Sequence, residues 1–469
     1  MKFILTQEIL LELKQICGEP FVFTDDETCR NYGHDETEDY NFPPSVVLKP
    51  ANALEISKIM VVANKYKIPV VPIGGRTGLS GGALSIFNGI GLSTERLNKI
   101  IEIDEQNLQI TTEPAVITQI LQDAVLEKGL FYPVDPSSRG SCFIGGNVAE
   151  NAGGARAVKY GVTKDYVLNL EVVLPNGEII WTGANTLKNS TGYNLTQLMV
   201  GSEGTLGIIT KIVLKLLPKN NFNVLMLVPF YKSEEACMAV SEIFKAGIIP
   251  SALEFMERDA IDWTIKYIDN VNIDIKPEIQ AHLLIEVDGN YPEILFQEAE
   301  KIMMVLEKYQ IDDVLFADTE EQKNALWKMR RAVGEAVKSN SIYKEEDTVV
   351  PRYELPILLK GVKTIGKKYG FESVCYGHAG DGNLHINIVK GNMTDSNWKT
   401  EVPKGIKEIF ELTVSLKGTL SGEHGIGYVQ KEFMHIAFNK VQLELMRGIK
   451  QLFDPNNVLN PGKILPDNI

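Results

Sequence analysis

Hydrophobic residues recur at helical spacing in several segments of the chain and alternate with polar residues in others. Helical spacing predicts an amphipathic helix in residues 1–17, where glutamates interrupt the apolar positions, and a second helix in 53–67. The second helix precedes a predicted strand at 68–73, which runs directly into two glycines. Residues 110–129 repeat the order strand, helix, strand. Residues 168–183 alternate around a Pro-Asn-Gly turn, which predicts a β-hairpin.

A change of composition at residues 219–221, just after a predicted closing strand at 211–218, predicts a domain boundary. Beyond it, strand patterns alternate with helical patterns. The strands are expected at residues 224–230, 252–258, 281–289 and 312–318. This order predicts an open antiparallel or mixed sheet with helices on one face. The segment 441–464 predicts a helix that ends in a tail rich in Pro, Asn and Gly. The expected fold class is α+β, in at least two domains.

The net charge and the distribution of basic residues indicate which kinds of molecule the protein binds. The chain has 469 residues and a formal net charge of -14, and its length predicts two or three domains. Binding to nucleic-acid phosphates needs a concentrated basic surface, and no block of consecutive lysines and arginines occurs. Nucleic acid is therefore excluded as the main partner. An anionic small substrate is not excluded, because one buried arginine can dominate a local site.

The spacing of the cysteines and the length of the apolar segments indicate the cellular compartment of the protein. The five cysteines are scattered without a C-x-x-C pair, which excludes an iron–sulfur cluster held by this chain alone and a disulfide framework. The N-terminal segment is too polar for a signal peptide, and no uncharged apolar segment is long enough to cross a bilayer. A soluble, cytoplasmic protein is the expectation, with peripheral association at a membrane surface left open.

Three glycine-rich stretches lie in the first half of the chain, at residues 72–82, 135–154 and 201–210. The first follows a predicted strand, and its glycines let several backbone N–H groups turn toward an anion such as a diphosphate. A tight structural turn is the alternative for any one loop. The small residues of the second stretch cannot build a core, but they let the backbone lie flat against a large planar ring. No nucleoside-triphosphate motif occurs, and residues 83–97 predict loop and strand where a Rossmann fold needs a helix.

In order and spacing these stretches resemble the FAD-binding domain of the vanillyl-alcohol-oxidase superfamily. The resemblance implies two α+β subdomains with FAD between them, the diphosphate on Gly74–Gly82, and the isoalloxazine ring reaching the second domain. It implies FAD held without a covalent bond, because the first stretch has no histidine or cysteine, although Cys142 keeps a covalent link open. The residues assigned to FAD in this way are Pro72, Gly74, Gly75, Arg76, Thr77, Gly78, Leu79, Ser80, Gly81, Gly82, Pro136, Gly140, Ser141, Gly145, Gly146, Asn151, Gly154, Gly204, Ile209 and Asn460.

Three of the six histidines lie in two glycine-rich motifs of the second half. His378 is flanked by glycine and is expected on a loop. Residues 384–389 alternate as a strand, which places His385 and Asn387 on one face. The second motif contains Glu423 and His424. Two imidazoles and a carboxylate suit zinc, manganese or iron(II), with positions left open for a substrate. A structural role is the alternative for any single histidine.

These motifs resemble the C-terminal domain of FAD-linked D-2-hydroxy-acid dehydrogenases, the family of D-lactate dehydrogenase, D-2-hydroxyglutarate dehydrogenase and the large glycolate oxidase subunit. The likeness extends from residue 43 to the Asn-Pro-Gly-Lys at 460–463. It implies that His378, His385 and Glu423 ligate a divalent metal, with zinc first and manganese or iron as alternatives. It further implies that His424 takes the hydroxyl proton, and that Asn387 and His424 contact the substrate.

The segment 327–330, Trp-Lys-Met-Arg, resembles the family's substrate-arginine segment, which implies that Arg330 grips the substrate carboxylate at two points. A solvated helix arginine beside Arg331 is the alternative. Residues 346–352 most resemble the lactate and glycolate branch. The hydroxyglutarate branch carries a basic residue near Glu345, where this chain has an acid. The resemblance therefore favours D-lactate, ahead of glycolate and D-2-hydroxyglutarate.

The expected organisation is a helical segment (1–40), an FAD-binding domain (41–218), a substrate domain with an antiparallel sheet and the metal cluster (219–450), and a tail that returns to the FAD domain (451–469). Two other functions stay open. A flavin oxidase of an alcohol or sugar would not need the histidine–glutamate cluster, and a flavin subunit could carry electrons within a complex. An electron-transfer flavoprotein, an iron–sulfur subunit and quinone are the candidate electron acceptors, and a homodimer is a candidate assembly.

Overall fold

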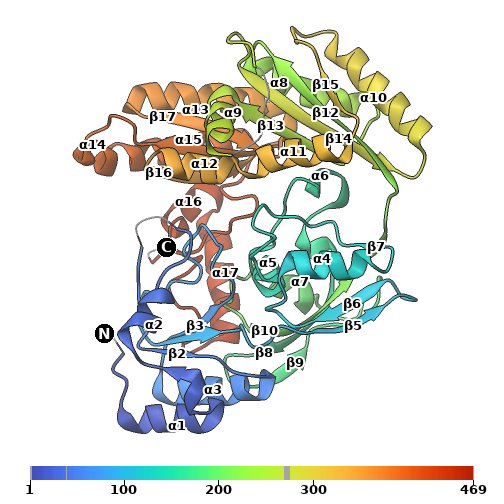
Figure 1. Ribbon diagram of the computed structural model, residues 1–469. Helices are drawn as coiled ribbons and strands as arrows, with labels where there is room; N and C mark the ends of the chain where they lie inside the picture. The colour runs from blue at the N-terminus through green and yellow to red at the C-terminus, as the bar shows by residue number, and fades with distance from the viewer. Residues whose placement is uncertain (1–2, 38–39, 269–274, 468–469) are drawn as a thin grey trace. The chain divides into compact units, whose positions relative to one another are not determined.

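The computed structural model describes residues 3–37, 40–268 and 275–467, and the chain divides into two compact units. Unit 1 comprises Met1–Gly153, Val162–Lys219 and Glu423–Ile469. Unit 2 comprises Gly154–Gly161 and Asn220–Gly422. The red C-terminal helix accordingly lies among the blue and cyan elements of unit 1 (Figure 1). The long segment of unit 2 begins at Asn220, and the chain returns to unit 1 at Glu423.

The first sheet of unit 1 has the strand order β1-β2-β4-β3. Its strands are β1 (Val22–Phe23), β2 (Val46–Leu48), β3 (Val70–Ile73) and β4 (Ile90–Ser93). Strand β4 pairs in parallel with β2 and β3, while β1 pairs antiparallel with β2. Helix α3 (Ala53–Tyr66) connects β2 to β3 and begins at Asn52, whose side chain accepts the N–H of Glu55 as an N-cap. With α1 (Gln7–Cys17), it buries its apolar positions in one core with this sheet.

The second sheet of unit 1 is antiparallel throughout, with the order β5-β6-β10-β8-β9. Its strands are β5 (Ile100–Asp104), β6 (Gln109–Thr112), β8 (Val167–Val173), β9 (Ile179–Trp181) and β10 (Ile208–Lys215), and a small separate pair is formed by β7 (Leu130–Phe131) and β11 (Leu217–Pro218). The hairpin predicted at 168–183 is confirmed, with Val173 opposite Ile179. Two sheets with their own helices confirm the two expected α+β subdomains.

The other helices of unit 1 connect these sheets or belong to the returning C-terminal segment. They are α2 (Asp26–Asn31), α4 (Thr118–Leu126), α5 (Ile144–Glu150), α7 (Leu195–Met199), α16 (Met434–Ala437) and α17 (Lys440–Phe453), with 3-10 turns at Glu19–Phe21, Thr163–Asp165 and Lys431–Phe433. Helix α17 starts with a capping box, because Asn439 and Gln442 each accept the other's backbone N–H. It is the helix predicted for the C-terminal segment.

Unit 2 is built on a seven-stranded sheet of order β15-β12-β14-β13-β17-β18-β16, with antiparallel pairs. Its strands are β12 (Phe222–Phe230), β13 (Ala252–Glu257), β14 (Ala281–Gly289), β15 (Leu315–Ala317), β16 (Tyr343–Val349), β17 (Glu372–Gly377) and β18 (Asn383–Val389). The helices are α6 (Ala157–Tyr160), α8 (Ser233–Lys245), α9 (Arg258–Tyr267), α10 (Pro292–Leu306), α11 (Glu320–Arg331), α12 (Val333–Asn340), α13 (Leu355–Tyr369), α14 (Asp395–Thr400) and α15 (Val402–Ser415), with 3-10 turns at Arg352–Glu354 and Ala379–Asp381.

Helices cover both faces of this sheet. One face packs with α9, α11 and α12 in a shared core that contains Met256 and Leu284. The intervening residues Phe255, Ile285 and Ile386 are fully buried as well, and α8, α10 and α13 contact the strands. The prediction of helices on one face was therefore wrong. Strand β14 is buried from Ala281 to Asp288, and burial of successive residues requires cover on both faces of the sheet.

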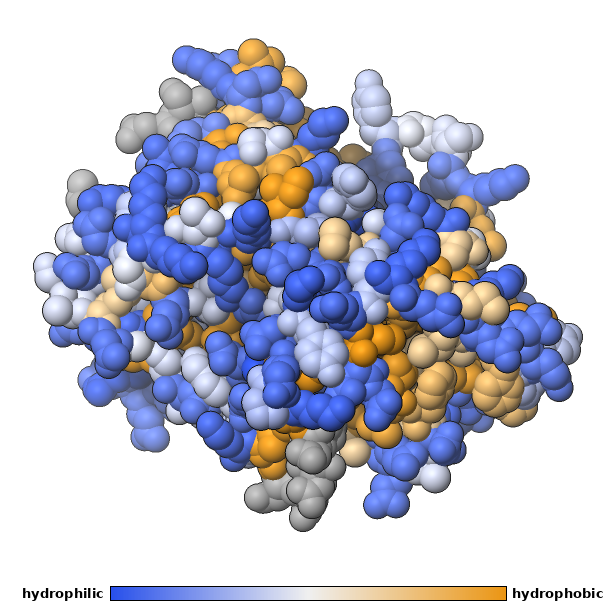
Figure 2. All heavy atoms as spheres, turned by 90° about the horizontal axis from the view of Figure 1, so that it is seen from above, coloured by the Kyte–Doolittle hydropathy of each residue, from blue (hydrophilic) through white to orange (hydrophobic). Residues whose placement is uncertain are grey.

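Within the described residues, no helix combines the length and the apolarity that a bilayer crossing requires. Figure 2 shows one face of the protein, on which hydrophilic side chains surround smaller apolar patches. Exposed large apolar residues do occur, such as Phe296 and Met304 on α10. Scattered apolar exposure of this kind is ordinary for a folded protein.

Candidate active site

The first glycine-rich loop begins where the parallel strand β3 ends. Gly74–Gly82 continues from Ile73, whose carbonyl oxygen accepts the N–H of Thr94 at 3.0 Å. A Cβ added to Gly78 would meet no protein atom within 4 Å, so the backbone here faces open space. Gly140 and Gly146 of the second stretch have the same property. Exposed backbone at these glycines fits the close approach of a diphosphate or a flat ring.

The second glycine-rich stretch contains the short helix α5. Ile144 and Val148 of this helix are fully buried, so the expectation that the stretch builds no core was wrong. Their spacing of four residues places both side chains on one helix face. Gly145 allows a close contact within the protein, because an added Cβ would lie 2.5 Å from Cβ of Pro114.

The C-terminal Asn-Pro-Gly-Lys segment packs against the first glycine loop within unit 1. Asn460 Nδ2 donates to the carbonyl oxygens of Gly82 at 3.1 Å and Glu203 at 2.7 Å. Lys463 Nζ donates to the carbonyl oxygen of Leu84 at 2.7 Å, and burial lowers the pKa of this amine to about 7. The third stretch also bonds to the second, since Gly201 N donates to Val148 O at 3.0 Å, so all three glycine-rich stretches are joined to the C-terminal tail or to each other.

Cys142 is enclosed just before α5. Its Sγ lies 3.2 Å from Oγ1 of Thr118, and burial raises the pKa of the thiol. A buried, protonated thiol is a poor nucleophile. This environment fits FAD that is held without a covalent bond.

A band of polar side chains crosses β16, β17 and β18 of unit 2. His385 and Asn387 lie on one face of β18, as their spacing predicted. Tyr376 stands opposite His385, and Glu345 stands opposite Asn387. The rings of Tyr376 and His385 are 5.2 Å apart, and the Tyr376 hydroxyl donates to Glu345 at 3.3 Å. A buried cluster of polar groups is unusual inside a protein and marks a candidate functional site.

His378 lies on a loop after β17, as predicted, and is oriented by a carboxylate. Its Nδ1 donates to Oε2 and Oε1 of Glu254 at 2.9 and 3.0 Å. This bond leaves the lone pair on Nε2, the arrangement typical of a metal-binding histidine. A ring nitrogen of His378 lies within 4.8 Å of one of His385, and the ring centres are 5.3 Å apart. Both imidazoles can therefore approach one metal ion.

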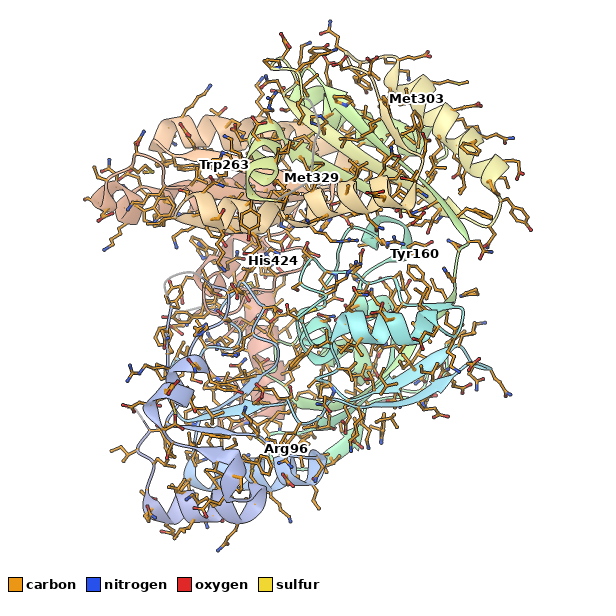
Figure 3. The ribbon with its side chains drawn as sticks, viewed as in Figure 1. Arg96, Tyr160, Trp263, Met303, Met329 and His424 are labelled. Atoms are coloured by element: carbon orange, nitrogen blue, oxygen red, sulfur yellow. The ribbon has the colours of Figure 1, made fainter. Side chains whose placement is uncertain are left out.

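The same carboxylate faces Arg330 of α11. Arg330 Nη2 lies 2.7 Å from Glu254 Oε2, and the guanidinium carbon lies 5.0 Å from the centre of the Tyr376 ring. Burial acts to raise the pKa of Glu254, but His378 and Arg330 hold that pKa below its ordinary value. Arg330 is 3% exposed and is not a solvated surface arginine. Its neighbour Met329 is labelled in Figure 3.

Two buried side chains of unit 2 have unused hydrogen-bonding capacity. Arg330 Nη2 forms an ion pair with Glu254, but the angles at Nε and Nη2 do not give either atom a hydrogen bond to a described residue. Neither the amide nitrogen nor the amide oxygen of Asn387 has a hydrogen-bond partner in the described part of the chain, although the side chain is fully buried. Because buried polar groups are nearly always hydrogen-bonded, these two side chains suit a polar ligand.

Glu423 and His424 lie where the chain passes from unit 2 into unit 1. The preceding residues are held within unit 2, since Ser421 Oγ and Gly422 N donate to Asp347 Oδ2 at 3.0 and 2.9 Å. Within unit 1, a Cβ added to Gly153 would lie 2.8 Å from Glu423 Oε2. His424 follows on the same loop and is labelled in Figure 3. The predicted metal ligands are divided between the units, with His378 and His385 in unit 2 and Glu423 in unit 1. Their binding of one metal ion therefore stays a prediction.

Glu254, Asp347 and Glu203 were not among the predicted site residues, although each contacts a predicted residue or its loop. Glu254 had a signal, because it is a carboxylate inside the apolar strand pattern of 252–256. No local sequence pattern marked Asp347 or Glu203, because their partners depend on how distant segments of the chain come together.

Two family models match the chain. The FAD binding domain matches residues 44–183, and the model described as FAD linked oxidases, C-terminal domain, matches residues 219–464. The glycolate oxidase subunit GlcD of Bacillus subtilis (strain 168) is 40% identical over 98% of this chain and 97% of its own. D-lactate dehydrogenase of Anaerostipes hadrus is 38% identical with the same coverage. D-2-hydroxyglutarate dehydrogenase of Stutzerimonas stutzeri (strain A1501) is 32% identical over 97% of this chain and 98% of its own.

Solved structures share the fold at low sequence identity. p-Cresol methylhydroxylase superposes with a TM-score of 0.78 at 17% identity, covering 99% of this chain and 98% of its own. The 4-ethylphenol oxidase of Gulosibacter chungangensis superposes with a TM-score of 0.75 at 19% identity, covering 98% and 97%. The chain belongs to the FAD-linked oxidase family, with a fold of the vanillyl-alcohol-oxidase type. It is an FAD-linked oxidoreductase of the type that includes those D-lactate, glycolate and D-2-hydroxyglutarate enzymes, as the sequence motifs predicted.

Proposed function

We propose that the protein oxidises a small D-2-hydroxy acid to the 2-oxo acid, with D-lactate ahead of glycolate and D-2-hydroxyglutarate. The observation that carries the proposal is the pair of buried polar side chains, Arg330 and Asn387, beside the two histidines of unit 2: Nε of Arg330 and both amide atoms of Asn387 have no hydrogen-bond partner among the described residues. A 2-hydroxy acid has a carboxylate and an adjacent hydroxyl, and these groups match such a surface. The names of the relatives agree with this substrate class.

Arg330 is proposed to hold the substrate carboxylate. Its guanidinium keeps its charge at any physiological pH and offers donors in a planar fork, which suits a two-point contact. Its contacts with Glu254 and the Tyr376 ring fix the side chain before substrate arrives. Asn387 is proposed to bind the remaining polar atoms of the substrate through its amide.

His378, His385 and Glu423 are proposed to hold a divalent metal, with zinc first and manganese or iron as alternatives. Two imidazoles and a carboxylate are an ordinary donor set for these ions, and the bond from His378 to Glu254 is the outer contact that such a ligand needs. When bound, the metal supplies Lewis-acid stabilisation of the substrate's deprotonated hydroxyl. Asn387 and Arg330 then keep the substrate's hydroxyl and carboxylate oriented.

His424 is proposed to take the hydroxyl proton. It directly follows Glu423, so a base and a metal ligand reach the substrate from one short loop. An imidazole is suited to this role because its ordinary pKa lies near physiological pH. FAD, held on the glycine loops of unit 1, would supply the redox chemistry as the two-electron oxidant of the substrate. Exposed backbone at Gly78, Gly140 and Gly146 is proposed to contact it.

Glu345 supports the preference for a small substrate. Its carboxylate lies 3.5 Å from Nδ1 of His385, and its side chain is 8% exposed. A second carboxylate on the substrate would meet this buried negative charge, whereas the methyl group of lactate would not.

Electrons are proposed to leave FAD for an external acceptor. All five cysteines are buried and free, so they offer no internal iron–sulfur carrier. An iron–sulfur subunit, an electron-transfer flavoprotein and quinone are the candidates. The description of the Bacillus subtilis relative as a subunit supports an acceptor on a second protein chain.

The test is anaerobic bleaching of the protein-bound flavin by D-lactate, L-lactate, glycolate and D-2-hydroxyglutarate. D-lactate should bleach the flavin most efficiently, and L-lactate should leave it oxidised. In Glu345→Lys the preference should shift toward D-2-hydroxyglutarate, and Glu345→Gln should give an intermediate ratio. Failure of every 2-hydroxy acid to bleach the flavin would refute the proposal.

A further inference from the structure

A buried carboxylate of unit 1 holds the loop that carries His424. Within this base loop, residues 423–427, Glu203 Oε1 accepts the N–H of Ile426 at 2.8 Å. Glu203 Oε2 accepts the N–H of Gly427 at 2.7 Å. These are charge-assisted bonds to the backbone, so they restrain the chain and not merely a side chain.

Glu203 is itself fixed in an unusual conformation. Its φ is 50° and it is 6% exposed, in the third glycine-rich stretch. A left-handed backbone is unfavourable at a residue other than glycine. Its own N–H donates to Ala149 at 2.9 Å, and its carbonyl oxygen accepts from Asn460 at 2.7 Å. The segment is thus held where the carboxylate meets the base loop.

The base loop lies directly against two carboxyl groups. A Cβ added to Gly425 would lie 2.1 Å from Glu150 Oε2 and 2.9 Å from Glu203 Oε1. Glu150 Oε2 has no hydrogen-bond partner among the described residues, and burial, together with the neighbouring Glu203, raises its pKa well above the ordinary value. Burial also raises the pKa of Glu203, to about 7, but the N–H groups of Ile426 and Gly427 favour its charged form. Glu203 is therefore the acceptor for the loop, whereas the raised pKa of Glu150 favours its protonated form.

We propose that Glu203 is a positioning residue for His424, because its two backbone bonds keep the base loop in one place. This inference rests on the proposed function, in which His424 removes the hydroxyl proton. A base must lie within hydrogen-bond reach of the proton it takes, and a displacement of about 1 Å can cost about 100-fold in rate. The following residues are restrained too, since Ser80 O accepts from Tyr428 and Val429 at 2.9 and 3.1 Å.

The first test compares Glu203→Gln with Glu150→Gln. The Glu203 variant keeps one acceptor but turns an amide NH₂ toward the other backbone N–H. Its rate of flavin reduction at saturating D-lactate should fall by about 10-fold to 100-fold, with unchanged substrate affinity and FAD content. Glu150→Gln keeps the size of the neighbouring side chain and removes neither of the two loop hydrogen bonds to Glu203, so it should leave that rate unchanged. Equal slowing in both variants, or loss of FAD from Glu203→Gln, would overturn the proposal.

The second test repeats Glu203→Gln in a His424→Ala background. A residue that acts through His424 has no further effect once the imidazole is gone, whereas a merely structural role lowers the rate in both backgrounds. Gly425→Ala, which displaces the base loop and leaves Glu203 intact, should show the same pattern. Equal slowing in both backgrounds would overturn the positioning role alone. Undiminished flavin reduction in His424→Ala would instead refute the base assigned in the proposed function, and this inference with it.

Discussion

Nδ1 of His378 lies 2.9 Å from Oε2 of Glu254. This bond joins the loop after β17 to strand β13, and the same carboxylate oxygen lies 2.7 Å from Arg330 Nη2. One buried side chain therefore orients both a proposed metal ligand and the proposed substrate anchor. The arrangement explains why a fully buried carboxylate is present at this position of β13.

Replacing Glu254 should weaken metal binding without removing a ligand. Glu254→Gln takes away the charge that orients His378, and metal affinity should fall by about 10-fold to 100-fold. Metal titration followed by elemental analysis would measure the change. Glu257→Gln is the matched control, because Glu257 is a buried carboxylate on the same strand that pairs with Lys363 at 2.7 Å. Equal metal loss in both variants would contradict the orienting role.

The substrate anchor can be tested with neighbouring arginines. Arg330→Lys keeps the charge but loses the planar fork, so flavin reduction by D-lactate should slow by about 100-fold while FAD stays bound. Arg331→Lys should behave like the unaltered protein, because Arg331 is partly exposed and contacts the Trp327 ring. Stopped-flow measurement of flavin reduction gives both rates. Full activity of Arg330→Lys would rule out the two-point grip.

In the FAD loops, a glycine that faces open space and a glycine that packs against the protein should respond differently to an added side chain. Gly78→Val fills open space, so it should lower FAD content while the FAD-free protein keeps its thermal stability. Gly145→Val would collide with Pro114 and should lower stability with or without FAD. Thermal unfolding and the flavin absorbance of each variant separate the two effects. Normal FAD content in Gly78→Val would place the diphosphate elsewhere.

Acid should destabilise the protein through His282. This histidine is buried between Pro229 and Met256 on adjacent strands, and burial lowers its pKa to about 4. As pH falls below its ordinary pKa near 6.5, the unfolded chain binds a proton that the folded protein excludes. Stability therefore falls between about pH 6.5 and about pH 4, by roughly 3 kcal/mol in total. His282→Leu should show a smaller difference between its unfolding midpoints at about pH 7.5 and about pH 5. An unchanged difference would assign the acid sensitivity to other groups.

Local patterns in the sequence predicted many of the elements and which candidate residues share a strand face. The Pro-Asn-Gly turn fixed the hairpin at 168–183, and alternation at 384–389 placed His385 and Asn387 on one face. These signals lie within single elements, where periodicity determines which side chains share a face. The motifs that resemble known flavoenzymes predicted the family and the FAD domain.

Contacts between distant segments could not be predicted in this way. Glu254 meets His378 only because β13 pairs with β17, and Glu203 meets the base loop only because the chain returns to unit 1 at Glu423. Helix α5 was missed because its glycines hide the buried pair Ile144 and Val148. Each of these features depends on tertiary pairing, which a local pattern does not contain.

The most direct test of the central claim is anaerobic flavin reduction by D-lactate before and after metal removal. Chelation should abolish bleaching without releasing FAD, and adding back a divalent metal should restore it. His378→Ala and Glu423→Ala should lose metal, whereas His424→Ala should keep metal and reduce flavin about 10²-fold to 10⁴-fold more slowly. Undiminished bleaching in metal-free protein would contradict the metal-assisted mechanism and favour a simple flavin oxidase.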